Sequence, residues 1–236
     1  MTTRLPDREG EAELRFLDQL ASTTGRRNFL QWSGLTLAAV AIGCSDDGDT
    51  GPSGSGSVDL GTGDTGVLNY AYALEQLEAA FYTAVTGSFY AGATAEEQTI
   101  LTDIKNHEVI HRDFLKAALG TAAIADLQVD FTSVNLADRT QVLNAAKTFE
   151  DLGVSAYNGA GKLLTDATNL LSAGRIVSVE ARHAAAIRDL IQANSFAGSD
   201  VVDANGLDMA RTPTEVLTAA DPYITTTINA SGLPTT

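Results

Sequence analysis

The 236-residue chain contains a single cysteine, Cys44. One thiol cannot form an intrachain disulfide, and it cannot supply the several sulfur ligands of a zinc ribbon or an iron–sulfur cluster. Basic side chains are also scarce, because 15 Lys and Arg stand against 30 Asp and Glu, giving a net charge of −15. A surface of this sign repels phosphate backbones, so the composition argues against nucleic acid as a partner.

A membrane-spanning run is missing from the N-terminal segment. The apolar part of residues 25–44, GRRNFLQWSGLTLAAVAIGC, is too short for a stable span. Two arginines precede it and small residues lead to Cys44, which is the composition of a cleaved export signal. The order Arg26, Arg27, Phe29, Leu30 resembles a twin-arginine signal, and residues 41–44, AIGC, resemble the site at which a cysteine is acylated.

This resemblance implies that residues 1–44 are a twin-arginine lipoprotein-type export signal. The partner would be the twin-arginine export machinery, and the protein would lie in the periplasm or cell envelope, with a lipid on Cys44 as its only membrane attachment. Residues 45–66 consist almost entirely of Gly, Ser, Asp and Thr, which bury too little apolar surface to offset ordering. We expect a flexible linker there and one folded domain over residues 67–236.

Helical spacing of apolar residues predicts long helices within that domain. A shorter helix should follow Thr212, since Thr-Pro-Thr-Glu places a capping residue before a proline at the first helical position. Residues 120–137 lack a sustained period and are long enough to run along a bundle. The fold class is therefore all-α, a four-helix bundle with a long connection between its second and third helices and a short C-terminal docking helix. The four long helices are expected at 67–85, 94–119, 138–163 and 168–194.

The stretch HEVIH at 107–111 has the spelling of a zinc-protease helix, with two histidines as ligands and a glutamate as general base. A third protein ligand does not follow it at a suitable spacing. A second Glu-x-x-His, Glu180 to His183, has Val179 in place of the leading histidine. The protease hypothesis leaves this second motif unexplained, so we expect His107 to be a partly exposed helix residue.

Four glutamates lie inside four different predicted helices, where a buried carboxylate is costly unless it is paired or bound to metal. Two of them begin the Glu-x-x-His motifs, whose spacing puts both side chains on one helix face. Counted along antiparallel hairpins, the four lie at similar heights. Each hairpin also has a tyrosine seven residues after its first glutamate, Tyr82 and Tyr157. The four glutamates are Glu75, Glu108, Glu150 and Glu180.

Four segments carry a family resemblance: LEQLEAAFY, HEVIHRDFL, FEDLGVSAYNGA and VEARHAAAIR. They resemble the four helices of the ferritin-like superfamily, and most of all its exported bacterial branch related to desiccation-associated proteins. The resemblance implies a site for two Fe or Mn ions per chain, with terminal glutamates 75 and 150 and bridging glutamates 108 and 180. The implied metal ligands are Glu75, Glu108, His111, Glu150, Glu180 and His183.

The same resemblance implies that Tyr82 and Tyr157 hydrogen-bond the carboxylates or supply an electron, with ordinary core packing as the alternative. The expected function is that of an oxidoreductase acting with O₂ or peroxide in envelope stress protection, as a ferroxidase using Fe(II) or as a peroxide-removing enzyme. The alternative is a non-catalytic stress- or desiccation-associated bundle protein, with or without bound metal. The metal, the substrate, the electron donor and the oligomeric state stay open, with a homodimer among the alternatives.

The export hypothesis predicts two separable defects. Replacing Arg26 and Arg27 together by lysine should hold the precursor in the cytoplasm, because the paired guanidinium groups are what the signal presents. Cys44→Ala should instead abolish the lipid. Cell fractionation and lipid labelling would measure both, and normal export of the double-lysine chain would contradict the hypothesis.

Overall fold

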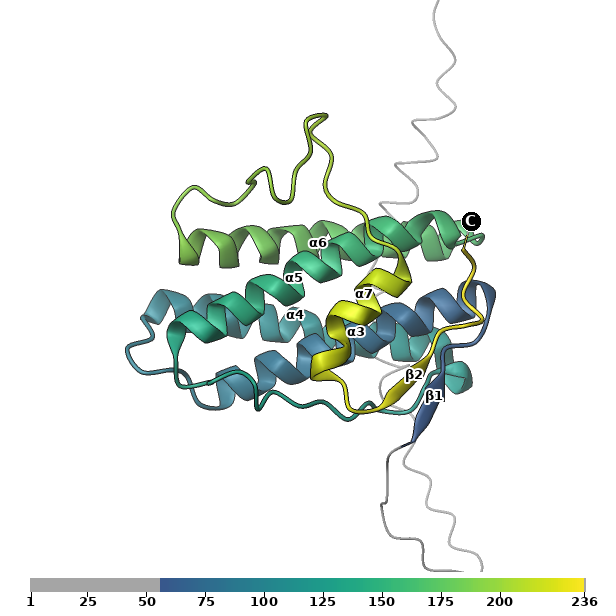
Figure 1. Cartoon of the computed structure of the whole chain (residues 1–236), viewed down its shortest axis with the longest axis horizontal. Helices are drawn as coiled ribbons and strands as arrows, with labels where there is room; N and C mark the ends of the chain where they lie inside the picture. Colours follow the sequence, from purple (N-terminus) through teal and green to yellow (C-terminus); the bar gives the residue numbers. More distant parts are fainter. Residues whose placement is uncertain (1–55, 236) are drawn as a thin grey trace, which may run out of the picture. The chain divides into compact units, whose positions relative to one another are not determined.

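The structure is a computed structural model that describes residues 56–235. The expected export signal, residues 1–44, and the linker up to residue 55 lie outside the described residues. The described part is mainly helical, as Figure 1 shows, and it confirms the all-α fold class. Its helices are α3 (Gly63–Gly87), α4 (Ala95–Leu119), α5 (Arg139–Ala160), α6 (Ala167–Ile191) and α7 (Pro213–Ala220).

The four long helices form two antiparallel hairpins, α3 with α4 and α5 with α6, which pack against each other along their lengths (Figure 1). The core between them consists of aliphatic and aromatic side chains from each hairpin. α7 packs on α5, with Val216 and Ala220 fully buried. The predicted third helix ends as a 3-10 turn, Gly161–Leu163, and the fourth ends at Ile191, three residues before the expected position.

Capping residues set the helix starts. The Thr94 hydroxyl accepts from the Glu97 backbone N–H, and the Glu97 carboxylate accepts from the Thr94 N–H, so the two residues form a capping box. Glu97 also pairs with Arg139 at 2.5 Å, so the beginning of α4 is joined to the beginning of α5. A second box between Thr212 and Glu215 starts α7.

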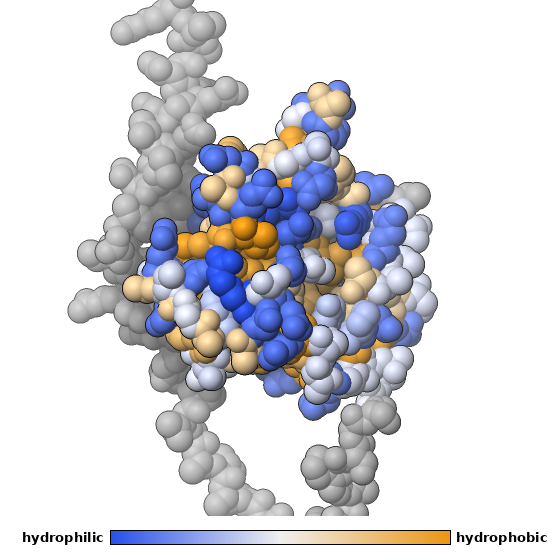
Figure 2. All heavy atoms as spheres, turned by 60° about the vertical axis from the view of Figure 1, so that its left-hand side comes forward, coloured by the Kyte–Doolittle hydropathy of each residue, from blue (hydrophilic) through white to orange (hydrophobic). Residues whose placement is uncertain are grey.

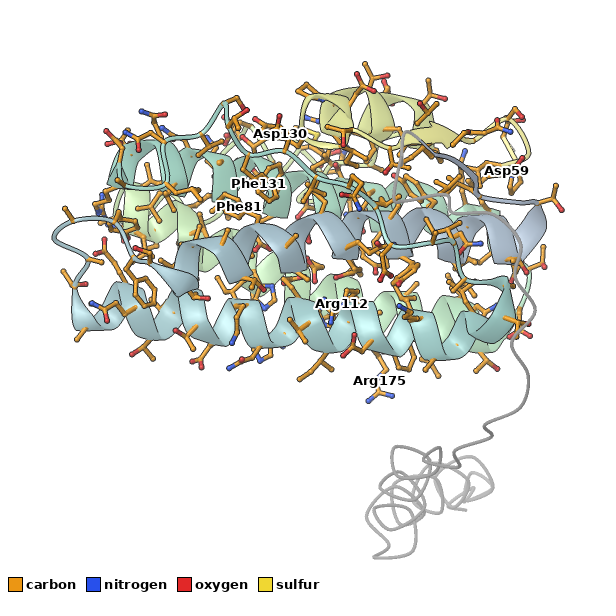
Figure 3. All side chains as sticks on the ribbon, turned by 90° about the horizontal axis from the view of Figure 1, so that it is seen from below. Asp59, Phe81, Arg112, Asp130, Phe131 and Arg175 are labelled. Atoms are coloured by element: carbon orange, nitrogen blue, oxygen red, sulfur yellow. The ribbon has the colours of Figure 1, made fainter. Side chains whose placement is uncertain are left out.

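The predicted crossover between α4 and α5 runs along the bundle (Figure 1). Phe131 anchors it, packing edge-to-face on Phe81 of α3 at 5.5 Å between ring centres, and Figure 3 shows the two side by side. The crossover also contacts the C-terminal tail, since Thr225 donates its N–H to the Gln128 carbonyl. Extended chain therefore covers one side of the core.

Part of the expected linker is ordered structure. Residues 57–66 include strand β1 (Ser57–Asp59) and the first turn of α3, whereas we expected the linker to reach residue 66. β1 pairs in parallel with β2 (Thr227–Asn229), and Leu60 next to it is fully buried. Composition alone does not reveal this strand. Its polar surroundings are typical of a linker, and its partner strand β2 is distant in the sequence.

Surface hydropathy is mixed. On the face that Figure 2 shows, hydrophilic residues surround smaller apolar areas. Large apolar side chains that are exposed include Phe114 (47%) and Leu171 (57%). Within residues 56–235, no helix combines the length and the hydropathy that crossing a membrane requires.

Two helical glycines allow a matched test of the packing. A Cβ at Gly159 of α5 would lie 1.7 Å from the backbone oxygen of Arg211, whereas a Cβ at Gly174 of α6 would meet nothing within 4 Å. We expect Gly159→Ala to lower the free energy of unfolding by about 2 kcal/mol or more, because the segment before α7 must move. Gly174→Ala should raise it by about 0.5–1 kcal/mol. Urea titrations would check both, and equal midpoints would contradict this packing.

Candidate metal centre

Four glutamates from the four long helices meet at mid-height in the bundle core. Each has at most 1% of its surface exposed, and the two histidines that follow Glu108 and Glu180 by three residues are also buried. The helical spacing therefore does what the sequence predicts, because it turns each glutamate and histidine toward the same interior point. The four glutamates are Glu75 on α3, Glu108 on α4, Glu150 on α5 and Glu180 on α6.

The cluster divides into two overlapping groups of potential ligands. In each group, the chosen ligand atoms lie within 4.8 Å of one another. Glu108 and Glu180 belong to both groups, so their carboxylates occupy the middle of the cluster. The first group is Glu75, Glu108, His111 and Glu180, and the second is Glu108, Glu150, Glu180 and His183.

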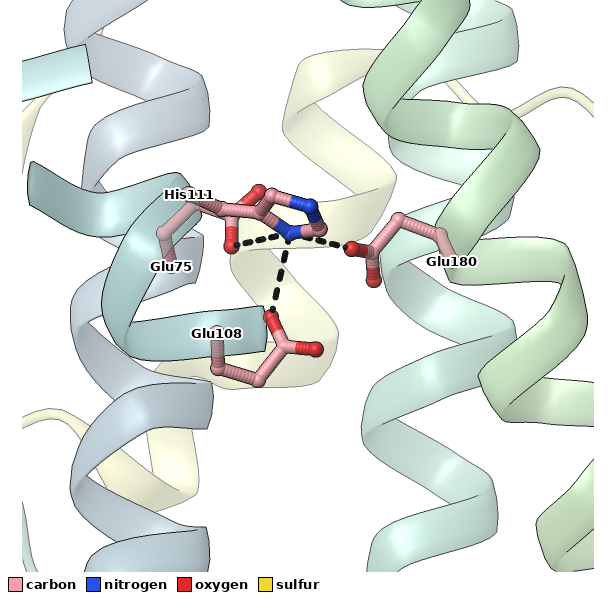
Figure 4. A group of neighbouring side chains, drawn as sticks. All are labelled: Glu75, Glu108, His111 and Glu180. Atoms are coloured by element: carbon pink, nitrogen blue, oxygen red, sulfur yellow. Dashed lines mark ion pairs between the residues drawn. The ribbon is translucent and has the colours of Figure 1, made fainter. Parts of the chain in front are cut away.

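Each histidine lies closest to the central glutamate of the opposite hairpin. His111 Nδ1 on α4 is 2.8 Å from Glu180 Oε1, and Figure 4 also shows its longer contacts with Glu75 Oε2 (3.6 Å) and Glu108 Oε2 (3.7 Å). His183 Nδ1 on α6 is 2.8 Å from Glu108 Oε1. The two arrangements mirror each other, as two similar hairpins facing each other should produce.

Many polar atoms of the cluster have no hydrogen-bond partner among the described residues, although buried polar groups normally have one. The contacts of His111 with Glu180 and of His183 with Glu108 are 2.8 Å long, but their angles are not those of a hydrogen bond. The donor atoms of the cluster therefore point toward shared positions instead of pairing with one another. Such a donor set fits two metal ions. The unpartnered cluster atoms are one oxygen each of Glu75 and Glu150, both oxygens of Glu108 and Glu180, and Nδ1 of His111 and His183.

The two tyrosines cross between the hairpins. Tyr82 on α3 donates its hydroxyl to Glu150 Oε1 of α5, and Tyr157 on α5 donates to Glu75 Oε1 of α3, each at 2.5 Å. Each tyrosine thus hydrogen-bonds one oxygen of an outer glutamate, Glu75 or Glu150. The second oxygen of each of these carboxylates has no hydrogen-bond partner among the described residues. The expected hydrogen bonds to carboxylates are present, but each reaches the glutamate of the other hairpin.

Charges in the cluster are strongly coupled. Burial raises the pKa of Glu75 to about 7 and that of Glu180 well above its usual range. Burial opposes protonation of His111, yet the surrounding carboxylates of Glu108, Glu180 and Glu75 raise its pKa to about 12. Glu108 shows the converse, because the adjacent imidazoles outweigh burial and bring its pKa down to about 2. Positive charge at this point therefore stabilises the carboxylates.

His107 takes part in the site, which sequence reasoning missed. It is exposed on α4, as expected, but its Nδ1 lies 2.9 Å from Nε2 of His183, in hydrogen-bonding contact. This contact engages the nitrogen of His183 that faces away from the cluster and fixes the ring orientation. The sequence does distinguish the two hairpins at this position. HEVIH begins with His107, whereas VEARH has Val179 before its glutamate.

Glu78 is a further carboxylate at the cluster, which sequence reasoning missed. It is 3% exposed on α3, three residues after Glu75. Its counterpart in the second hairpin is Gly153, three residues after Glu150, and a Cβ there would lie 3.0 Å from Glu78 Oε1 and 3.3 Å from Glu180 Oε2. The missing side chain makes room for Glu78. Burial, followed by the charge of Glu180, raises the pKa of Glu78 well above its usual range.

Comparison with known protein families identifies the type of domain. A family model described as a ferritin-like domain matches residues 63–193, which is more than half of the chain. The matched range contains the four long helices and every residue of the cluster. A search of curated proteins finds no match.

The contact between His107 and His183 predicts an unequal effect on two metal ions. His107→Ala should weaken binding at the His183 group by about 10-fold, the lower end of the loss found when a residue supporting a metal ligand is removed. Binding at the His111 group should change less, because it shares with the His183 group only the two central glutamates. Calorimetric titration with Mn(II) would resolve the two events, and Asn106→Ala, an exposed neighbour on the same helix, is the control. Identical titrations of His107→Ala and the parent would contradict the supporting role.

Proposed function

Because the chain belongs to the ferritin-like domain family, we propose that its buried carboxylate–imidazole cluster is a di-metal site with an oxidoreductase function. The proposed ligands are the six residues of the two overlapping groups. Glu108 and Glu180 would bridge the two ions, and each ion would also take one outer glutamate and one histidine. The reaction would use O₂ or peroxide, as a ferroxidase or in peroxide removal.

One observation carries the proposal: the unpartnered buried donors fall into two overlapping groups. Each group contains one outer glutamate, both central glutamates and one imidazole nitrogen. Oxygen donors outnumber nitrogen donors and sulfur is absent from the set, a combination that suits Fe or Mn better than Cu or a structural zinc. Bound Fe or Mn would supply the one-electron redox chemistry that O₂ or peroxide requires.

The chain's own residues prepare the site. Tyr82 and Tyr157 hold the outer glutamates from opposite hairpins, so that the second oxygen of each faces the centre. His107 fixes the ring of His183. Burial, followed by the charge of the adjacent Glu180, raises the pKa of Glu78, which favours the protonated carboxyl. Reduction of O₂ or peroxide takes up protons, which makes this carboxyl a suitable local donor.

Export belongs to the same proposal. The resemblance of residues 25–44 to a twin-arginine lipoprotein signal supports a place in the periplasm or cell envelope, with attachment through Cys44. The twin-arginine route carries proteins that are already folded, so the buried cluster could receive metal before export. A role in envelope stress protection would follow from this location.

Glu150→Ala tests the proposed ligand set. Glu150 lies far in sequence from both Glu-x-x-His motifs, so its involvement is the least obvious consequence of the proposed ligand set. We expect the parent to bind two ions per chain, and the variant to bind metal at least about 10-fold more weakly and to lose oxidation of added Fe(II). Metal analysis and stopped-flow absorbance would measure these effects. Glu96→Ala, an exposed glutamate in the first turn of α4, is the matched control.

The outcomes separate the candidate functions. Retention of two ions and full activity by Glu150→Ala would contradict the six-ligand site. A parent chain that binds two ions but oxidises neither Fe(II) nor a reductant with peroxide would instead favour the non-catalytic bundle. Thermal melts of the metal-free chains would show whether the variant folds. We expect it to do so, because removing one of several buried carboxylates relieves repulsion.

A further inference from the structure

A series of aromatic side chains leads away from the carboxylate cluster. Its first member is Tyr82, whose hydroxyl donates to Glu150 Oε1. The Tyr82 ring lies edge-to-face on Phe81, with 5.3 Å between the ring centres. Phe81 contacts Phe149 in the same way at 4.9 Å, and Phe149 contacts Tyr223 at 4.8 Å. These four rings form an unbroken series, which we call the aromatic route.

The two tyrosines at the ends of the aromatic route differ in exposure. Tyr82 is fully buried, and the two phenylalanines between the ends are buried as well. Tyr223 lies in the short turn after α7 and is partly exposed. All six tyrosines of the chain lie within the described residues, and the other five are buried. Tyr223 is therefore the one tyrosine ring that a molecule in solution can readily contact.

The other tyrosine of the cluster shows that this series is not needed to hold a carboxylate. Tyr157 donates to Glu75 just as Tyr82 donates to Glu150. Within residues 56–235, however, no series of ring contacts continues from Tyr157 toward the surface. Core packing accounts for buried phenylalanines, but it does not require a phenol at each end of them. The aromatic route thus joins one half of the cluster to the surface through side chains of which the first and last can be oxidised.

We propose that Tyr223 is the place where a small one-electron reductant of the hydroquinone type delivers electrons, and that the aromatic route carries them to Tyr82 at the cluster. This inference rests on the proposed function, because O₂ or peroxide supplies the oxidising equivalents at the di-metal site. A phenol can lose an electron together with its proton, whereas the phenylalanine rings are not oxidised themselves. Their π-systems fill the gap between the two phenols and favour electron tunnelling across it.

Each transfer moves one electron and balances its protons. An electron passes from the Tyr82 ring to the oxidised site, and the hydroxyl proton moves to its hydrogen-bond partner, Glu150 Oε1. An electron from Tyr223 then reduces the Tyr82 radical, which takes its proton back, while the Tyr223 proton goes to water. The reductant gives a hydrogen atom to the Tyr223 oxygen. Two such transfers, with the two protons released, convert hydrogen peroxide and a hydroquinone to two waters and a quinone.

Trapping of the radical on Tyr223 tests the aromatic route. Hydrogen peroxide is added to the Fe(II)-loaded full chain with a nitroso spin trap, and peptide mass spectrometry locates the adduct. We expect an adduct on Tyr223 in the parent, and its loss to the level of the metal-free chain in Tyr82→Phe. Phe149→Leu should lower the adduct, because it removes a ring of the route. Phe131→Leu, the same change in a ring that packs beside the route on Phe81, should not.

Tyr223→Phe tests the delivery point, with p-hydroquinone as the reductant. This variant should bind two ions as the parent does and lose peroxide-dependent oxidation of p-hydroquinone. The inference is overturned if that oxidation is unchanged, if Tyr82→Phe keeps the Tyr223 adduct, or if the two Phe→Leu variants carry it equally. Metal content and Fe(II) oxidation of the same samples distinguish the failures. A parent that binds two ions and oxidises Fe(II) without a Tyr223 adduct contradicts only the aromatic route, whereas a parent that does neither contradicts the proposed function as well.

Discussion

Burial of five carboxylates at one height of the bundle is the constraint on which the rest of the structure depends. Each would be costly alone, so the cluster needs protons, imidazolium groups or metal ions to balance it. In the metal-free chain, the raised pKa values of His111 and His183, to about 12 and about 10, favour imidazolium groups that balance part of this charge, and burial raises the pKa of Glu78. Because the carboxylates come from all four long helices, the same balance fixes the relative heights of the two hairpins. The five are Glu75, Glu78, Glu108, Glu150 and Glu180.

The two hairpins are alike in the residues that face the centre and differ at two places around them. Glu78 has a glycine as its counterpart, and His107 has a valine. Both extra polar groups belong to the first hairpin, and both reach toward α6 of the second, Glu78 beside Glu180 and His107 against His183. The two halves of the cluster are therefore chemically unequal, although their central donors match.

Helix spans and the convergence of the Glu-x-x-His motifs followed from sequence because both rest on local rules, the 3.6-residue period and the spacing of three. Features that depend on the other hairpin did not. Glu78 could be interpreted as a surface residue, since only the absence of a side chain at Gly153 makes its burial feasible. The crossed bonds of Tyr82 and Tyr157 likewise depend on how the hairpins face each other. β1 was missed because its partner strand is distant in the chain.

The pairing of β1 with β2 also orders events in time. Asn229 donates its side-chain amide to Asp59, 170 residues earlier, so this contact cannot form until residue 229 has left the ribosome. The helical hairpins, which are built from nearer contacts, can assemble during synthesis. Closure of the strand pair is thus a late event in the maturation of the domain. The strand pair joins the segment before α3 to the segment after α7. A chain truncated before residue 227 would therefore lack this pairing.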